Sequence, residues 1–104
     1  MSEKLPDLLE EQDTRAEDET REPPMYKVLL HNDDFTTRDF VVEVLVAIFA
    51  KSVEEVTRLM WHIHRNGTGV CGVYPFEIAE TKVSATTLLA HEKGFPLKTT
   101  LEQM

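Results

Sequence analysis

The stretch "MYKVLLHNDDFTTRDF", residues 25–40, decides the fold because it reads as a strand that passes through a polar turn into a helix. Its apolar side chains alternate, with Tyr26, Val28 and Leu30 on one face, which is the period of a half-buried strand. The apolar run ends at His31, and three residues whose side chains accept hydrogen bonds follow it. The sequence therefore predicts a strand and a helix with a polar turn between them.

The helix after this turn is predicted from a cap and a helical period. Thr36 can cap its start, with Asp39 three residues on as the return partner of a capping box. Apolar side chains then recur at helical spacing at Phe40, Val41, Val44, Leu45, Ile48 and Phe49.

A better capping box opens the second predicted helix, in "KSVEEVTRLMWHIHRNG", residues 51–67. Ser52 and Glu55 have the capping-box spacing, and Asn66 followed by Gly67 is typical of a helix end. One apolar stripe lies between these signals, formed by Val56, Leu59, Met60 and Ile63.

The rest of the chain predicts a strand, a helix and a final strand. "TGVCGVYPF" reads as a strand, and the helix that follows has Pro75 near its first turn and Gly94 beyond its end. "FPLKTTLEQ" is expected at the edge of the sheet, where the missing N–H of Pro96 is tolerated. The order β-α-α-β-α-β predicts an α/β (α+β) fold, a small three-stranded sheet with three helices packed on one face.

The first 24 residues differ in composition from the rest. They carry nine acidic and three basic side chains, so −6 of the formal net charge of −8 lies there. Three prolines and few large apolar residues leave this segment unable to bury enough surface to offset its ordering entropy. We expect a disordered acidic arm over residues 1–24 and one folded domain over residues 25–104.

Composition also argues against several classes of partner. The net negative charge disfavours nucleic acid, and no apolar stretch is long enough for a membrane span. The single cysteine, Cys71, fits a reducing compartment and reads as a small buried hydrophobe in a strand.

The acceptors Asn32, Asp33 and Asp34 have an ordinary explanation and a functional one. Asx side chains bond their own backbone and favour turns, so this pattern alone first indicates a turn. A calcium loop of the EF-hand type is excluded, because neither its glycine nor its distal glutamate follows Asp34. A binding site requires other residues to converge on the turn.

Four histidines, at positions 31, 62, 64 and 91, raise the question of a metal site. His62 and His64 are two residues apart on a predicted helix and point to different sides, so they cannot both hold one ion. The chain also lacks a nucleophile motif and a glycine-rich phosphate loop. The sequence indicates a binding module with no cofactor rather than an enzyme.

Five segments together resemble one family. They are "PPMYKVLLHNDDFT", "TRLMWHIH", "GVCGVY", "EIAETKV" and "FPLKTTLE", in the order and spacing of ClpS, the adaptor that delivers proteins with destabilising N-terminal residues to the ClpAP protease. The resemblance covers residues 23–103. It implies an adaptor domain without catalytic activity, with a pocket for an N-terminal amino acid and a docking face for the N-terminal domain of the ClpA unfoldase.

By this resemblance, Asn32, Asp33 and His64 hold the α-amino group of the substrate, and Asp34 stands beside them as support. The implied chemistry is sound, since an ammonium has three donors and no acceptor, and a carboxylate, an amide oxygen and a neutral imidazole can all accept. His64 lies four residues after Met60, which places an apolar wall and a polar contact on the same helix face.

The resemblance also implies which residues wall the pocket for the first side chain: Thr36, Val41, Met60 and Leu97. Such a pocket would select proteins that begin with Phe, Tyr, Trp or Leu. Arg38 departs from the family, which commonly has a pocket-gating methionine there. We expect its guanidinium to swing outward, toward Asp34 or Asp39, and to relax the discrimination against Ile and Val.

The second implied surface contains Glu77 and Lys82, which match positions that contact the unfoldase. By analogy, the acidic arm is the part engaged by the unfoldase pore. We expect a monomer in the bacterial cytoplasm, with a plastid stroma as the alternative. The rival hypothesis is a structural interaction module with one fixed partner and no recognition of free N-termini; a metal hydrolase built on His62 and His64 ranks third.

Overall fold

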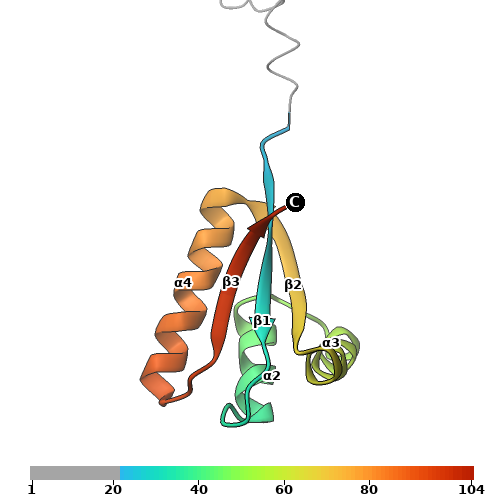
Figure 1. Ribbon diagram of the computed structural model, residues 1–104, viewed down its shortest axis with the longest axis vertical. Helices are drawn as coiled ribbons and strands as arrows, with labels where there is room; N and C mark the ends of the chain where they lie inside the picture. Colours follow the sequence, from blue (N-terminus) through green and yellow to red (C-terminus); the bar gives the residue numbers. More distant parts are fainter. Residues whose placement is uncertain (1–21) are drawn as a thin grey trace, which may run out of the picture.

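The computed structural model describes residues 22–104, which form six elements in the predicted order. Residues 1–21 of the predicted arm lie outside the described part, so its disorder stays a prediction. The elements are β1 (Met25–His31), α2 (Arg38–Ala47), α3 (Val53–Asn66), β2 (Thr68–Pro75), α4 (Phe76–Lys93) and β3 (Lys98–Gln103) (Figure 1).

The three strands form one antiparallel sheet in the order β2-β1-β3, with β1 in the centre. The register between β1 and β2 shifts between Val28 and Leu29, and β3 pairs with β1 without a shift. The prediction that the last strand is an edge strand is confirmed. Pro96 is not part of it, since β3 begins at Lys98, and its missing donor is therefore not needed by the sheet.

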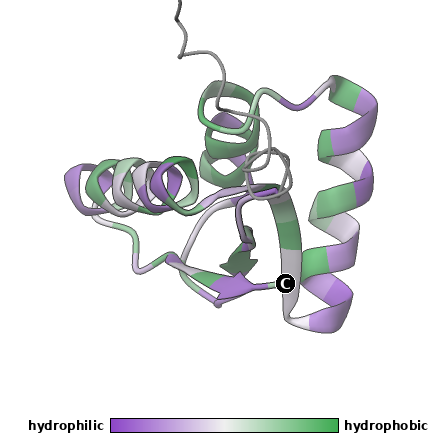
Figure 2. Cartoon of the chain, turned by 90° about the horizontal axis from the view of Figure 1, so that it is seen from above, coloured by the Kyte–Doolittle hydropathy of each residue, from purple (hydrophilic) through white to green (hydrophobic). Residues whose placement is uncertain are grey.

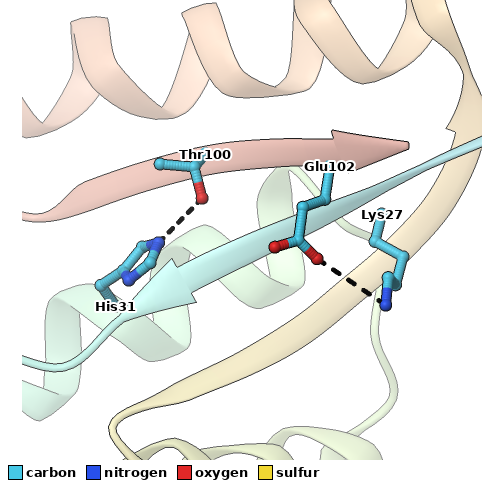
Figure 3. Close-up of polar contacts among 4 residues, drawn as sticks. All are labelled: Lys27, His31, Thr100 and Glu102. Carbon is cyan, nitrogen blue, oxygen red and sulfur yellow. Dashed lines mark hydrogen bonds and ion pairs between the residues drawn. The ribbon is translucent and has the colours of Figure 1, made fainter. Parts of the chain in front are cut away.

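The helices lie around one side of the sheet, as expected, and cover the apolar face of β1 (Figures 1 and 2). The buried core between them consists of Val28, Leu30, Phe40, Val44, Leu45, Phe49, Val56, Ile63, Cys71, Ala79, Ala90 and Leu97. The alternate residues of β1 face away from the helices. There, Lys27 pairs with Glu102 at 3.8 Å, and His31 Nε2 lies 2.8 Å from Thr100 Oγ1 (Figure 3).

The start and end of α2 differ from the prediction. Thr37, and not Thr36, is the N-cap, and its hydroxyl accepts the N–H of Phe40 at 3.2 Å. The helix ends at Ala47 rather than Phe49, and Ala50 then turns the chain with a positive φ of 54°. Thr36 cannot cap the helix because its side chain bonds a residue of the turn, as described below.

The predicted signals for α3 are confirmed. The N–H of Ser52 donates to Glu55 Oε1 at 3.0 Å, and the N–H of Glu55 donates to Ser52 Oγ at 3.3 Å. At the other end Gly67 adopts the left-handed conformation with φ 86°. None of the helices in the described part of the chain has the length and apolar character needed to cross a membrane.

Cys71 occupies the position expected of a small apolar residue. Its side chain is completely buried in β2, and this burial raises the pKa of the thiol to about 12. The thiol therefore stays protonated at neutral pH, which agrees with a packing role rather than a nucleophilic one.

Candidate functional site

A pocket of about 510 Å³ opens between α2 and α3, beside the segment that follows β1. Its lining combines polar groups with a larger set of apolar side chains. The polar members are Asn32, Asp33, Thr36, Arg38, Asp39, Thr57 and His64, and the apolar ones are Val41, Val42, Val46, Val53, Val56, Met60, Trp61 and Ile63. A concave apolar site with a few convergent polar groups is the usual form of a small-ligand site.

One backbone hydrogen bond assembles the polar end of the pocket. The N–H of Asn32 donates to the carbonyl of Gly67 at 2.8 Å, which ties the segment after β1 to the end of α3. His64 lies in the last turn of α3, just before Gly67. The left-handed glycine therefore closes the helix and also holds Asn32 and Asp33 beside His64.

Asp33 is the centre of the turn, which confirms the turn hypothesis for this residue. Its Oδ1 accepts the N–H groups of Phe35 and Thr36 at 2.8 and 2.7 Å, and its Oδ2 accepts the Thr36 hydroxyl at 2.7 Å. Partial burial alone would raise the pKa of Asp33, but these hydrogen bonds from Thr36 and Phe35 together hold it below its ordinary value. A charged carboxylate therefore faces the pocket at neutral pH.

Turn formation does not use up the acceptor capacity of Asp33. A carboxylate offers about four acceptor positions, and only one bond within residues 22–104 reaches Oδ2. Oδ2 can therefore accept a further donor from a ligand. The turn and binding hypotheses are compatible, because the turn orients the group that the ligand would meet.

The apolar wall comes mainly from α2 and α3. Val41 of α2 and Met60 of α3 both line the pocket, and Met60 precedes His64 by one helical turn, as predicted. Three other apolar side chains of the lining are unusually exposed: Val46 at 48%, Val53 at 76% and Trp61 at 55%. Exposed apolar side chains gathered around a concave site indicate a binding surface.

Two predicted pocket residues lie outside this lining. Leu97 is only 7% exposed and packs in the core, and Asp34 is exposed beside the pocket without lining it. Arg38 is exposed and lines the pocket together with Asp39, and within residues 22–104 no ion pair joins Arg38 to Asp34 or Asp39. Arg38 is the first residue of α2 and therefore lies at the junction between the turn and the helix.

Comparison with known proteins identifies the family. The family model described as ATP-dependent Clp protease adaptor protein ClpS matches residues 21–100. The chain belongs to the ClpS family. It is 47% identical over 103 residues to the Clp protease adapter ClpS of Desulforapulum autotrophicum, covering 99% of each chain. With the ClpS of Lawsonia intracellularis the identity is 52% over 88 residues, 85% of this chain and 81% of that one.

A solved ClpS structure has the same fold. Agrobacterium tumefaciens ClpS2, bound to L-phenylalaninamide, superposes with a TM-score of 0.76 at 46% sequence identity. The match covers 80% of this chain and all of that one. The fold predicted from the resemblance is therefore confirmed for this member of the ClpS family.

The two residues predicted to dock the unfoldase lie in different environments. Glu77 is exposed in the first turn of α4. Lys82 is half-buried: its Nζ donates to the carbonyl of Ile48 at 2.7 Å and lies 5.7 Å from the centre of the Tyr74 ring. Because Ile48 is the C-cap of α2, Lys82 links α4 to α2 in addition to any role at the surface.

Sequence reasoning missed Trp61 as a member of the lining. It is one turn before His64, and the two rings meet edge to face with their centres 6.1 Å apart. The i, i+3 spacing of these residues, together with Thr57 one turn earlier, was the signal available in the sequence.

The structure places His62 away from this pocket. Its Nδ1 lies 3.2 Å from the side-chain nitrogen of Asn66, on the side of α3 opposite to that of His64. Within residues 22–104, no three His, Cys, Asp or Glu side chains are gathered so that they could hold a metal ion.

Proposed function

We propose that this ClpS chain is a non-enzymatic adaptor that binds the free N-terminal residue of proteins beginning with Phe, Tyr, Trp or Leu and delivers them to the ClpA unfoldase for degradation by ClpAP. The observation that carries this proposal is a single pocket in which an acceptor rim of Asn32, Asp33 and His64 adjoins an apolar wall that includes Met60.

The acceptor rim suits a protein's α-ammonium group. An ammonium donates three hydrogen bonds and accepts none, and the rim offers the Asn32 amide oxygen, the open position on Asp33 Oδ2 and an imidazole nitrogen. Within residues 22–104, neither ring nitrogen of His64 has a hydrogen-bond partner. Each charge-assisted bond would contribute roughly 1.5–3 kcal/mol when well made.

The ligand of the Agrobacterium protein supports the same assignment. L-phenylalaninamide has a free α-amino group, a benzyl side chain and an amide in place of the carboxylate. It therefore has the chemistry of an N-terminal Phe together with its first peptide bond. Two related chains of one fold are expected to bind ligands of one class when the contacting residues are of the same kind.

The apolar wall favours large first residues. Burying a Phe or Leu side chain contributes about 1.5–3 kcal/mol more than leaving it exposed, and Ala contributes much less. Met60 supplies an adaptable surface for side chains of different shape. Arg38 in the lining adds a cation at the place where the family commonly has a methionine, so we propose that Ile and Val are less strongly excluded here.

Calorimetric titration with three peptides tests the proposal. A peptide that begins with Phe should bind, and the same peptide beginning with Ala should bind at least tenfold more weakly, about 1.4 kcal/mol. Acetylation of the Phe peptide removes the ammonium and should abolish binding. Equal binding of all three peptides would favour the rival module with one fixed partner.

Delivery requires a second surface, which we place at Glu77 and Lys82 on α4. We propose that the N-terminal domain of ClpA docks there while the acidic arm enters the unfoldase pore, and that the adaptor acts as a monomer in the bacterial cytoplasm. The exposure of Glu77 supports this placement. Glu77→Arg should abolish binding to isolated ClpA and leave affinity for the Phe peptide unchanged; a loss of both would place Glu77 elsewhere.

A further inference from the structure

A second hollow of about 660 Å³ lies along the outer side of α3. We call it the basic hollow, because Lys51, Arg58 and Arg65 are the cations of its lining. The rest of the lining is Glu55, Thr57, Leu59, Trp61, His62, Asn66 and Val70. Three of the eight lysine and arginine side chains of residues 25–104 thus gather at one place, on a domain whose net charge is −2.

The one acidic residue of the basic hollow is already engaged. The Glu55 carboxylate accepts the backbone N–H and the hydroxyl of Ser52, at 3.0 and 3.2 Å. These bonds, and the nearby charges of Lys51 and Arg58, lower the pKa of Glu55. Glu55 therefore caps the N-terminus of α3. The three cations of the basic hollow outnumber its single negative charge.

Trp61 separates the basic hollow from the pocket, since it lines both. On one side its ring contacts His64, with the centres 6.1 Å apart. On the other side the Arg65 guanidinium lies 5.8 Å from the centre of the same ring. Helical spacing places Arg58, like Arg65, on the side of Trp61 away from His64.

A peptide held by its α-amino group can reach the basic hollow within a few residues. Its first residue would lie beside His64, and an extended chain advances about 3.3 Å per residue. The centre of the Trp61 ring lies 6.1 Å from that of His64 and 5.8 Å from the Arg65 guanidinium. The second and third residues of an extended chain, with the reach of their own side chains, can therefore pass the Trp61 ring. The side chains that follow the first one would then meet Arg65 and Arg58.

We propose that the basic hollow is a subsite for acidic side chains at the second and third positions of the substrate. This inference rests on the proposed function, and it adds a requirement beyond the first residue. Charge complementarity supports it, because two carboxylates placed there would face three cations on a chain that is otherwise acidic.

Titration with peptides that differ only at positions two and three tests the subsite. Phe-Asp-Asp should bind about two- to tenfold more tightly than Phe-Ser-Ser, and Phe-Lys-Lys more weakly than both, as expected for partly exposed charge pairs. This preference should shrink as salt is raised to about 1 M, where the screening length falls to about 3 Å.

Matched variants distinguish an effect of the basic hollow on peptide preference from an effect of the chain's overall charge. Arg58→Gln with Arg65→Gln should remove the preference for Phe-Asp-Asp, and Arg58→Glu with Arg65→Glu should reverse it toward Phe-Lys-Lys. The control, Lys27→Gln with Lys93→Gln, loses the same charge from two surface ion pairs, with Glu102 and Glu43, and should keep the preference. Equal behaviour of both double glutamine variants would overturn the subsite.

The same titrations distinguish this inference from the function on which it rests. If Phe-Ser-Ser binds more tightly than Ala-Ser-Ser but Phe-Asp-Asp shows no advantage, the subsite is wrong and the pocket stands. If Phe-Ser-Ser and Ala-Ser-Ser bind alike, the subsite and the proposed function of the pocket are both wrong. If acetylated Phe-Asp-Asp binds as tightly as the free peptide, the basic hollow is an independent site for acidic peptides, and its assignment to the substrate chain is overturned.

Discussion

Asp33 performs two tasks with one carboxylate. Its bonds to Phe35 and Thr36 shape the turn after β1, and the same side chain lines the pocket with one acceptor position left open. A residue whose orientation is fixed by the fold needs little ordering when a ligand arrives, and this lowers the entropic cost of binding. Stability and affinity should therefore change together when Asp33 is altered.

Asp33→Asn should lower the free energy of unfolding by about 0.5–1.5 kcal/mol at pH 7, because the amide nitrogen cannot accept the Thr36 hydroxyl. The pKa of Asp33 is lower in the folded chain than in the unfolded one. Its contribution is therefore present above the unfolded value of about 3.9 and is lost as the pH falls through the folded pKa. Urea unfolding of both chains should show a difference that is constant from pH 7 to 5 and narrows below about pH 4.

Arg38→Met tests the proposal that Arg38 relaxes the selectivity of the pocket. The substitution should remove the cation from the pocket lining and restore discrimination against Ile and Val as first residues. The measured quantity is the ratio of affinities for Phe and Ile peptides. Asp39→Asn is a control for a charge change at the neighbouring residue of the pocket lining. A native chain that already excludes Ile and Val as strongly as Arg38→Met would contradict the relaxed selectivity.

At the scale of elements, two glycines end helices in the same way but at different distances from the pocket. Gly67 ends α3 with φ 86°, Gly94 ends α4 with φ 79°, and at both a Cβ would meet no atom within 4 Å. Substitution by Ala at either site therefore costs backbone energy alone, about 1–2 kcal/mol.

Only Gly67 also accepts the N–H of Asn32, which sets the rim of the pocket. Gly67→Ala should therefore weaken binding of the Phe peptide, and Gly94→Ala should reduce stability by a similar amount without changing affinity. Thermal unfolding and calorimetry on both variants check this. Equal losses of affinity would show that the helix end does not position Asn32.

The bond from Lys82 to the end of α2 gives a second prediction at this scale. Lys82→Met keeps most of the apolar stem but leaves the Ile48 carbonyl without this donor, and should cost about 1–3 kcal/mol in urea unfolding. The exposed Glu77→Gln should change stability by less than about 0.5 kcal/mol. Equal stabilities of the two variants would contradict the structural role of Lys82.

Element order and the caps of α3 were predictable because they depend on local patterns. The N-cap of α2 was not: Thr36 and Thr37 both have suitable side chains, and the choice depends on Asp33 binding the Thr36 hydroxyl. The pocket was predictable only in part. Met60 and His64 share a helix face by spacing, whereas the burial of Leu97 depends on how the segment before β3 packs against the core.

At the scale of the whole molecule, charge is divided between the arm and the domain. The first 24 residues carry −6 and residues 25–104 carry −2. Removal of residues 1–22 should leave the affinity for the Phe peptide unchanged, because the pocket is formed by residues 32–64. It should impair degradation of a Phe-tagged substrate by ClpAP, and unchanged degradation would remove the proposed role of the arm.

The position of Trp61 has a practical consequence. It is the only tryptophan of the chain, it is 55% exposed, and with Thr57 it lines both the pocket and the basic hollow. Its emission is therefore an optical signal from one known point on the surface, undiluted by other indoles. An apolar side chain arriving from one side and a carboxylate arriving from the other would alter that emission differently, so the native chain carries its own reporter for each part of a bound N-terminus.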